Sequence, residues 1–167
     1  ALFSEVLALA REGRYIYVEV KGNDPRWVPH IKDEIGKAKN VNPGNVLFIS
    51  FGDRVCAELK RAMPEYRVYF LTSCRKNVLG KRREEWPVRS ADEVVAKLRE
   101  LGVDGVDIWF DPSVIDKAYV DTVKAAGFSF HVWTIDDLGK AKAAFAVGAD
   151  TLTTNCAKKL VDEYEGR

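Results

Sequence analysis

The sequence predicts an α/β fold in which helices cover a parallel sheet. Short runs of β-branched and aromatic residues recur along the chain, and amphipathic helical segments separate them. Glycines stand at the ends of several helical segments, directly before the next apolar run. Strands that alternate with helices through short links form parallel sheets with the helices outside. A length of 167 residues suits one domain with a sizeable core.

Six strands are expected, each with a helix after it. The strands are residues 15–20, 45–50, 67–72, 105–110, 128–135 and 149–154. The clearest helical segments are residues 53–63, 114–127, 136–148 and 157–165. Gly102, Gly127 and Gly148 are expected to stop helices in the left-handed conformation. Such βα units are compatible with an open doubly wound sheet, or with most of an eight-unit barrel, which takes ~250 residues.

One connection is long and basic. It runs from Ser73 to Ser90 and includes Arg82 and Arg83. In a barrel it follows a strand and lies on the face that carries the active site, where a cationic cluster can steer an anionic substrate. The alternative is a solvated excursion at the surface.

Composition excludes several classes of function. The net charge of +1 gives no overall electrostatic case for a nucleic-acid partner. No apolar run approaches the ~18 residues that a transmembrane segment requires. The three cysteines are an odd number and lie far apart, which argues against a disulfide framework or a zinc site. The two histidines, His30 and His131, are also far apart in the sequence.

The first predicted strand carries an acid and a base at its carboxyl end. Side chains alternate along a strand, so Tyr17, Glu19 and Lys21 share one face, opposite Val18 and Val20. Parallel α/β folds bind ligands at the carboxyl ends of their strands. There, Glu19 is a candidate ligand for a cation, and the Lys21 ammonium suits an anionic group. The alternative is a surface ion pair.

Other strand ends offer further candidates. Ser50 stands at the end of the second strand, and Trp133 shares a face with His131 on the fifth. A tryptophan in this position either covers an apolar ligand surface or packs in the core. Thr154 and Asn155 follow the last strand, where they contact a ligand or cap the next helix.

Four segments together resemble the glycerophosphodiester phosphodiesterases, which are (β/α)₈-barrel enzymes. "LFSEVLALAREGRYIYVEVK" is similar to the family's helix and its "IEIK"-type strand, and "NVLFISFGDRVCAELKRAMPEYRVYFLT" to its "SFD…L…P…L" unit. "AAGFSFHVWTIDD" resembles the "GxxVxVWTVND" unit, and "VGADTLTTNCAKKL" the closing "GVDGIITDxP" unit. The matches occur in order over nearly the whole chain.

The resemblance implies a TIM-barrel fold, a substrate and a metal. Glu19 matches a carboxylate that binds a divalent cation, Mg or Ca. Lys21 matches a lysine near the substrate phosphate, and Trp133 matches a tryptophan at the mouth of the site. Ser50, at a strand end, is a further candidate for substrate binding. The implied reaction hydrolyses a glycerophosphodiester to sn-glycerol 3-phosphate and an alcohol, a step of lipid metabolism.

The departures from the family pattern are equally specific. The family's opening His-Arg-Gly, Glu-Asn-Thr, Glu-x-Asp and His-Asp motifs do not occur in the sequence. The first two βα units of the barrel therefore look absent, so residues 1–167 are expected to form one partial barrel domain with strands three to eight. No catalytic residue is assigned within the chain, because the matching histidines are missing. "SFD" is "SFG" here, with Asp53 one place later, and the closing "TD" is Thr154-Asn155, with Ala157 where the family has proline.

These observations support one function and one alternative. The first is a metal-dependent phosphodiester hydrolase that acts on a small-molecule substrate and turns over little as this chain alone. The alternative is a non-catalytic partial barrel that binds a partner or oligomerises. Six strands without closure expose two sheet edges, which makes a homo-oligomer through these edges an expectation.

Overall fold

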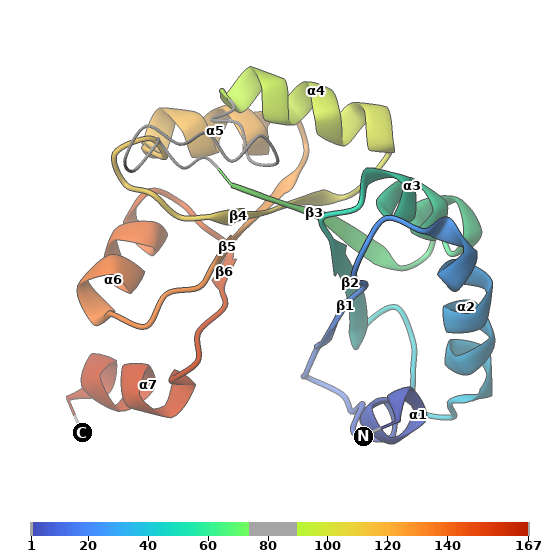
Figure 1. Cartoon of the computed structure of the whole chain (residues 1–167). Coiled ribbons are helices and arrows are strands. Elements are labelled where there is room, and N and C mark those ends of the chain that lie inside the picture. Colours follow the sequence, from blue (N-terminus) through green and yellow to red (C-terminus); the bar gives the residue numbers. More distant parts are fainter. Residues whose placement is uncertain (1, 74–89, 167) are drawn as a thin grey trace. The chain divides into compact units, whose positions relative to one another are not determined.

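A computed structural model of the chain describes residues 2–73 and 90–166 (Figure 1). The long basic connection, with Arg82 and Arg83, lies outside the described residues. The chain divides into two compact units. The first comprises residues 1–71 and 99–104, and the second comprises residues 72–98 and 105–167.

The predicted alternation of strands and helices is confirmed. The strands are β1 (Ile16–Glu19), β2 (Val46–Ser50), β3 (Arg67–Ser73), β4 (Gly105–Trp109), β5 (Ser129–Trp133) and β6 (Thr151–Leu152). Their order in the sheet is β1-β2-β3-β4-β5-β6, and the pairings β1–β2, β2–β3, β4–β5 and β5–β6 are parallel. The fold is therefore α/β, with a parallel sheet whose strands follow the order of the chain.

A helix follows every strand, as expected. The helices are α1 (Phe3–Leu7), η1 (Pro25–Trp27), α2 (Val28–Lys37), α3 (Asp53–Ala62), α4 (Ala91–Leu101), α5 (Lys117–Ala125), α6 (Leu138–Ala146) and α7 (Ala157–Glu165). None of the described helices combines the length and the apolar run needed to cross a membrane. The single domain predicted over residues 1–167 concerns how the two units join, and it stays a prediction.

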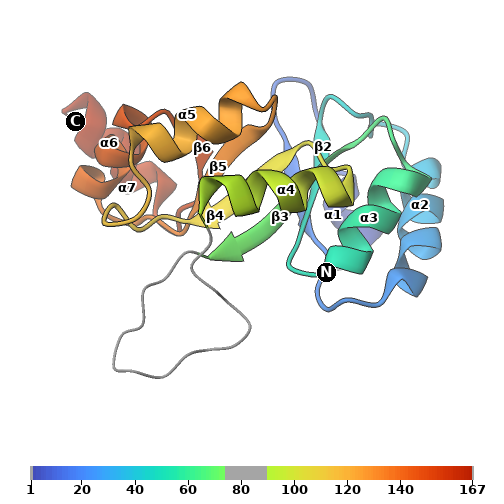
Figure 2. The same cartoon turned by 90° about the horizontal axis from the view of Figure 1, so that it is seen from above.

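In the first unit, helices α2 and α3 lie side by side (Figures 1 and 2). Helix α3 turns a buried stripe, Val55, Cys56 and Leu59, inward and keeps its charged residues outside. Phe48 of β2 is fully buried and meets the Tyr66 ring edge-on at 5.8 Å between centroids. Burial of each large apolar side chain contributes about 1.5–3 kcal/mol relative to exposure.

In the second unit, β4 and β5 bury one face completely. Val106 pairs with Phe130 and Ile108 with Val132, and all four side chains have no exposed surface. Tyr119 of α5 meets Phe130 edge-on at 6.2 Å between ring centroids. The opposite face of these strands therefore carries the remaining side chains, which include the polar ones.

The helix ends have local physical causes. Asp116 caps α5 by accepting the Tyr119 N–H at 2.8 Å, so the helix begins later than the predicted residue 114. The predicted glycine stops are confirmed, because Gly102, Gly127 and Gly148 have φ values of 66°, 92° and 103°. These left-handed residues end a helix and direct the chain into the next strand.

Candidate functional site

The predicted acid–base pair lies at the carboxyl end of β1. Glu19 is the last residue of the strand, and its Oε1 lies 2.6 Å from the Nζ of Lys21. The Glu19 side chain is 29% exposed, whereas that of Lys21 is 81% exposed. Exposed ion pairs of this kind contribute at most about 1 kcal/mol, because water and salt screen them. The Lys21 ammonium can therefore leave Glu19 for an incoming anion at a small energetic cost.

Ser50 lies on the other face of the sheet from Glu19. Glu19 pairs with Ile49, so the next residue of β2 points to the opposite side. Ser50 is fully buried; its hydroxyl donates to the Val20 carbonyl at 2.7 Å and accepts the Gly52 N–H at 3.1 Å. This geometry favours a structural role for Ser50 over substrate contact, which stays a prediction.

Trp133 is the last residue of β5 and is half-buried. Its Nε1–H donates to the Asp107 carbonyl at 3.0 Å, which fixes the orientation of the indole. Trp109, the last residue of β4, meets it edge-on at 5.2 Å between ring centroids. The Lys140 ammonium lies 5.5 Å from the centroid of the Trp109 ring, a cation–π contact. The strand ends thus form an aromatic pair with one cation beside it.

A polar row lies one layer below this aromatic pair. Asp107 pairs with His131 and His131 with Thr151 in the strand register. Asp107 and His131 are 1% and 6% exposed, so both side chains lie in the interior. The sequence indicated Asp107 as unusual, because it places a carboxylate inside an apolar strand that ends at Trp109. The other histidine, His30, is exposed on α2.

Thr154 and Asn155 bind the preceding loop instead of capping α7. Asp136 accepts the Thr154 hydroxyl at 2.9 Å, the Asn155 N–H at 2.7 Å and the Asn155 side-chain amide at 2.9 Å. The bonds from the side chain and then the N–H of Asn155, together with that of Thr154, lower the pKa of Asp136. The side chain of Cys156, the residue before α7, makes no cap hydrogen bond. The departure from the family's closing motif is therefore accommodated by a link between two loops.

The described residues supply one carboxylate for a divalent cation at the end of β1. Glu19 offers the oxygen ligands that Mg²⁺ and Ca²⁺ prefer. No three His, Cys, Asp or Glu side chains within residues 2–73 and 90–166 form a group that could hold a metal ion. These residues therefore do not make a complete cation centre, and Glu19 suits the role of a single ligand.

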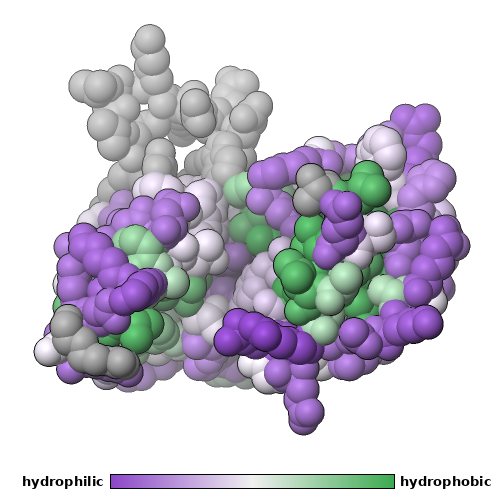
Figure 3. Space-filling view, turned by 90° about the horizontal axis from the view of Figure 1, so that it is seen from below, coloured by the Kyte–Doolittle hydropathy of each residue, from purple (hydrophilic) through white to green (hydrophobic). Residues whose placement is uncertain are grey.

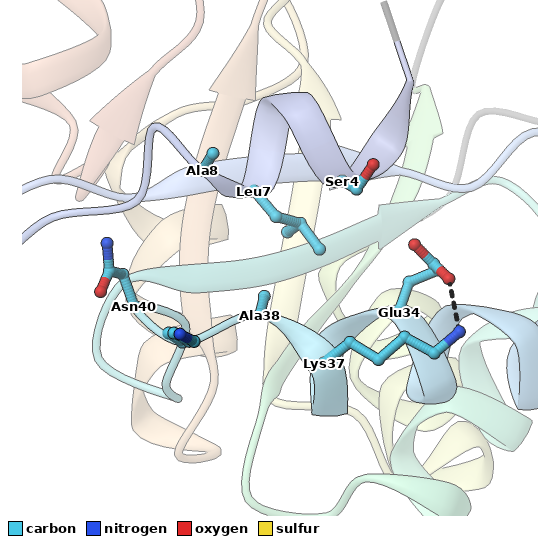
Figure 4. A pocket seen from close by; sticks show the side chains of 8 residues that line it. Ser4, Leu7, Ala8, Glu34, Lys37, Ala38 and Asn40 are labelled. Atoms are coloured by element: carbon cyan, nitrogen blue, oxygen red, sulfur yellow. Dashed lines mark hydrogen bonds and ion pairs between the residues drawn. The ribbon is translucent and has the colours of Figure 1, made fainter.

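A surface pocket lies away from the Glu19–Lys21 pair, between α1 and the carboxyl end of α2 (Figure 4). It measures about 310 Å³, with Leu7 and Ala38 lining it and Lys37 ion-paired to Glu34 at its rim. Helix α2 begins beyond the carboxyl end of β1 and ends before the amino end of β2. The pocket thus lies at the helix end that is remote from Glu19.

Most of the chain matches the model of one protein family. The glycerophosphoryl diester phosphodiesterase family model matches residues 18–159, a range that includes Glu19, Lys21 and Trp133. The chain belongs to this family. The match shows that the chain has a fold of the (β/α)-barrel type and that it resembles phosphodiesterases. The family generally uses a divalent metal. No curated protein matched the sequence.

Solved structures of phosphodiesterases share the fold at low sequence identity. A glycerophosphodiester phosphodiesterase from Parabacteroides distasonis is 23% identical, with a TM-score of 0.65, over 92% of this chain and 58% of that one. A putative glycerophosphoryl diester phosphodiesterase from Agrobacterium tumefaciens is 17% identical, with a TM-score of 0.74, over 98% and 64%. An Oleispira antarctica phosphodiesterase in complex with the product sn-glycerol-3-phosphate is 18% identical, with a TM-score of 0.64, over 84% and 50%. The chain thus spans half to two thirds of the length of these three structures.

Proposed function

We propose that the protein takes part in the metal-dependent hydrolysis of glycerophosphodiesters to sn-glycerol 3-phosphate and an alcohol, a reaction of lipid metabolism. The observation that carries this proposal is the Glu19–Lys21 pair at the carboxyl end of β1, within the matched range. The product complex of the Oleispira antarctica phosphodiesterase supports sn-glycerol 3-phosphate as the product class.

The chemistry of the pair suits a phosphodiester. The substrate phosphate carries a negative charge that repels nucleophiles, and further charge develops in the transition state. Lys21 would bind the phosphate by exchanging its weak ion pair with Glu19 for a charge-assisted bond to a phosphate oxygen. Glu19, once released, would be one ligand of a divalent cation, Mg or Ca, which supplies further neutralisation when bound.

The aromatic pair would border the substrate. Trp133 is oriented by its bond to the Asp107 carbonyl and lies at the end of a strand, where α/β barrels bind their ligands. We assign it to the apolar part of the substrate. Ser50 would act indirectly, by holding the backbone next to Lys21.

Neither histidine suits general acid–base catalysis in this reaction. His30 is exposed on α2, and His131 is buried below Trp133. We therefore propose that these 167 residues alone hydrolyse little substrate, as the missing family motifs predict.

The test measures turnover with matched variants. Release of sn-glycerol 3-phosphate from glycerophosphocholine is measured for the chain alone and for a chain fused to the two opening βα units of a family barrel. We expect activity only in the fusion, with Glu19→Gln and Lys21→Met each lowering it at least tenfold. Lys117→Met, which breaks the exposed Lys117–Asp121 pair on α5, is the charge-matched control. Full turnover by either site variant, or by the chain alone, would contradict the assignment.

A second candidate is a binding or oligomerisation module without catalysis. β1 and β6 are the outermost strands in the sheet order, and each is paired on one side within the described residues. Among the exposed apolar side chains, Leu2 and Leu9 flank α1 and Tyr15 directly precedes β1. Apolar patches stand out among polar side chains on one face (Figure 3). Sedimentation at two concentrations tests this candidate, since a concentration-independent monomer contradicts pairing between copies.

A further inference from the structure

We propose that Asn23 is a positioning residue for Lys21. It supplies from the β1–α2 loop the helix cap that Gly52 cannot provide, and together with Ser50 it fixes the backbone on both sides of Lys21. The functional part of this inference rests on the proposed function, in which Lys21 binds the substrate phosphate. The structural part stands on the contacts of the first unit alone.

Helix α3 is capped from a distant loop. The residue before the helix is Gly52, which has no side chain to cap it. The Asn23 Oδ1 accepts the N–H of Arg54 at 2.9 Å and that of Val55 at 3.3 Å. These are the groups that a side chain at the position of Gly52 normally satisfies. The Asn23 Nδ2 also donates to the Asp53 carboxylate at 2.8 Å, so both ends of the amide are used.

The loop occupies the space of the absent side chain. A Cβ at Gly52 would lie 2.3 Å from the Gly22 carbonyl oxygen, 2.8 Å from the Asn23 Oδ1 and 2.9 Å from the Asn23 Cα. The first and last of these atoms belong to the backbone, which cannot move without displacing the loop. The change from "SFD" to "SFG" is therefore coupled to the loop: a glycine at position 52 admits Gly22 and Asn23.

A second anchor lies on the other side of Lys21. Val20 donates its N–H to the Ile49 carbonyl at 2.9 Å, and its own carbonyl accepts the Ser50 hydroxyl at 2.7 Å. Lys21 and Gly22 are thus the only residues between two anchored positions, Val20 and Asn23. Gly22 makes this short span possible, because its φ of 79° is a conformation that other residues rarely adopt.

Ser50 and Asn23, which hold the backbone on the two sides of Lys21, are called the clamp below. The clamp affects the exposed lysine. The Lys21 side chain is 81% exposed and gains little order from packing, so its position depends on its backbone. A fixed backbone keeps the ammonium near the carboxyl end of β1 and lowers the entropy lost when a phosphate binds. Without the clamp, Lys21 would adopt the position that binds phosphate only part of the time. Its apparent affinity for phosphate would fall by the same fraction.

Two variants test the clamp from its two sides. Asn23→Ala removes the cap, whereas Gly52→Ala keeps every polar group and places a methyl group against the Gly22 carbonyl. Asp116→Ala is the matched control, because it deletes the side-chain cap of α5 in the second unit. Backbone ¹⁵N relaxation of the 167-residue chain gives order parameters for Lys21 and Gly22, and inorganic phosphate is titrated against the Lys21 amide.

In the parent chain and in Asp116→Ala, we expect order parameters of ~0.85 at Lys21 and Gly22, the value of a rigid backbone. Asn23→Ala and Gly52→Ala should each lower them to below ~0.6, the flexible range, and the double variant should be no lower than the singles. Phosphate affinity at Lys21 should fall about fivefold in both variants. Unchanged order parameters in Gly52→Ala would contradict the clamp. This outcome remains decisive even if Asn23→Ala does not fold. Rigid parent residues that show no phosphate shift at Lys21 count against the proposed function and leave the clamp standing.

Discussion

Asp104 and Asp150 make the same set of contacts at the amino ends of two strands. Asp104 accepts the Val68 N–H at 2.8 Å and the Lys60 ammonium at 2.9 Å, and its own N–H donates to the Val68 carbonyl at 2.9 Å. Asp150 accepts the Phe130 N–H at 2.8 Å and the Lys124 ammonium at 2.6 Å, and its N–H donates to the Phe130 carbonyl at 2.8 Å.

Each aspartate therefore joins a helix, the strand that follows this helix and the start of the next strand. Lys60 and Lys124 come from α3 and α5, whereas Val68 and Phe130 are the second residues of β3 and β5. The aspartates stand directly before β4 and β6. In barrel folds the amino ends of the strands serve stability, and the carboxyl ends serve function. The repeated contact set belongs to the stabilising end.

Asp104→Asn should destabilise the protein by about 1–2 kcal/mol, since a hydrogen bond to a charged group contributes about 1.5–3 kcal/mol and this pair is partly exposed. The side chains of Lys60 and Asp104 are 22% and 32% exposed. Urea denaturation followed by circular dichroism measures the change. Asp121→Asn, in the exposed Lys117–Asp121 pair, is the control and should shift stability by less than about 0.5 kcal/mol. Equal effects of the two substitutions would contradict the role of Asp104.

Acid should weaken the second unit through Asp150. Burial alone would raise the pKa of Asp150, but the bonds from Lys124 and from the Phe130 N–H outweigh it and lower the pKa. A carboxylate with a lowered folded pKa stabilises the fold above its unfolded pKa, and this stabilisation is lost as the pH falls through the folded pKa. Asp150→Asn should therefore flatten the acid limb of a plot of unfolding free energy against pH. An unchanged slope would show that Asp150 is not the group responsible.

Gly105→Ala should be strongly destabilising, because β4 begins against the backbone of β5. A Cβ at Gly105 would lie 2.4 Å from the Ser129 carbonyl oxygen and 3.0 Å from its carbonyl carbon. We expect a loss of about 1–3 kcal/mol, the range of overpacked buried sites. Gly36→Ala is the opposite control, because Gly36 lies within α2 with nothing within 4 Å of its added Cβ. That substitution should stabilise the helix by up to about 1 kcal/mol. Thermal unfolding of the two variants should move in opposite directions.

Trp133→Phe should release the aromatic pair at the ends of β4 and β5. The substitution removes the Nε1–H bond to the Asp107 carbonyl. The phenyl ring at position 133 then has no fixed orientation relative to Trp109. The near-ultraviolet circular dichroism of the coupled indoles should fall. Trp27→Phe is the control, because Trp27 is 58% exposed outside this pair. An equal loss of signal in both variants would contradict a specific Trp109–Trp133 coupling.

The succession of strands and helices could be predicted from the amino-acid sequence. Alternation along β1 separated Glu19 from Val20, and the glycine stops at Gly102, Gly127 and Gly148 were readable because both signals are local. The Glu-x-Lys and Val-Trp-Thr segments also indicated the family, which the match over residues 18–159 shows. These features depend on residues that are close together in the chain.

The contacts between distant segments became visible in the folded chain and could not be predicted from the sequence. Ser50 was placed at a strand end from the sequence, but the pairing of Glu19 with Ile49 turns it to the opposite face, where its hydroxyl holds Val20. The cap that Asn23 provides for α3 spans 31 residues to Arg54. Strand register and loop packing arise from side chains and backbone groups that meet only in the folded chain, so no local pattern specifies them.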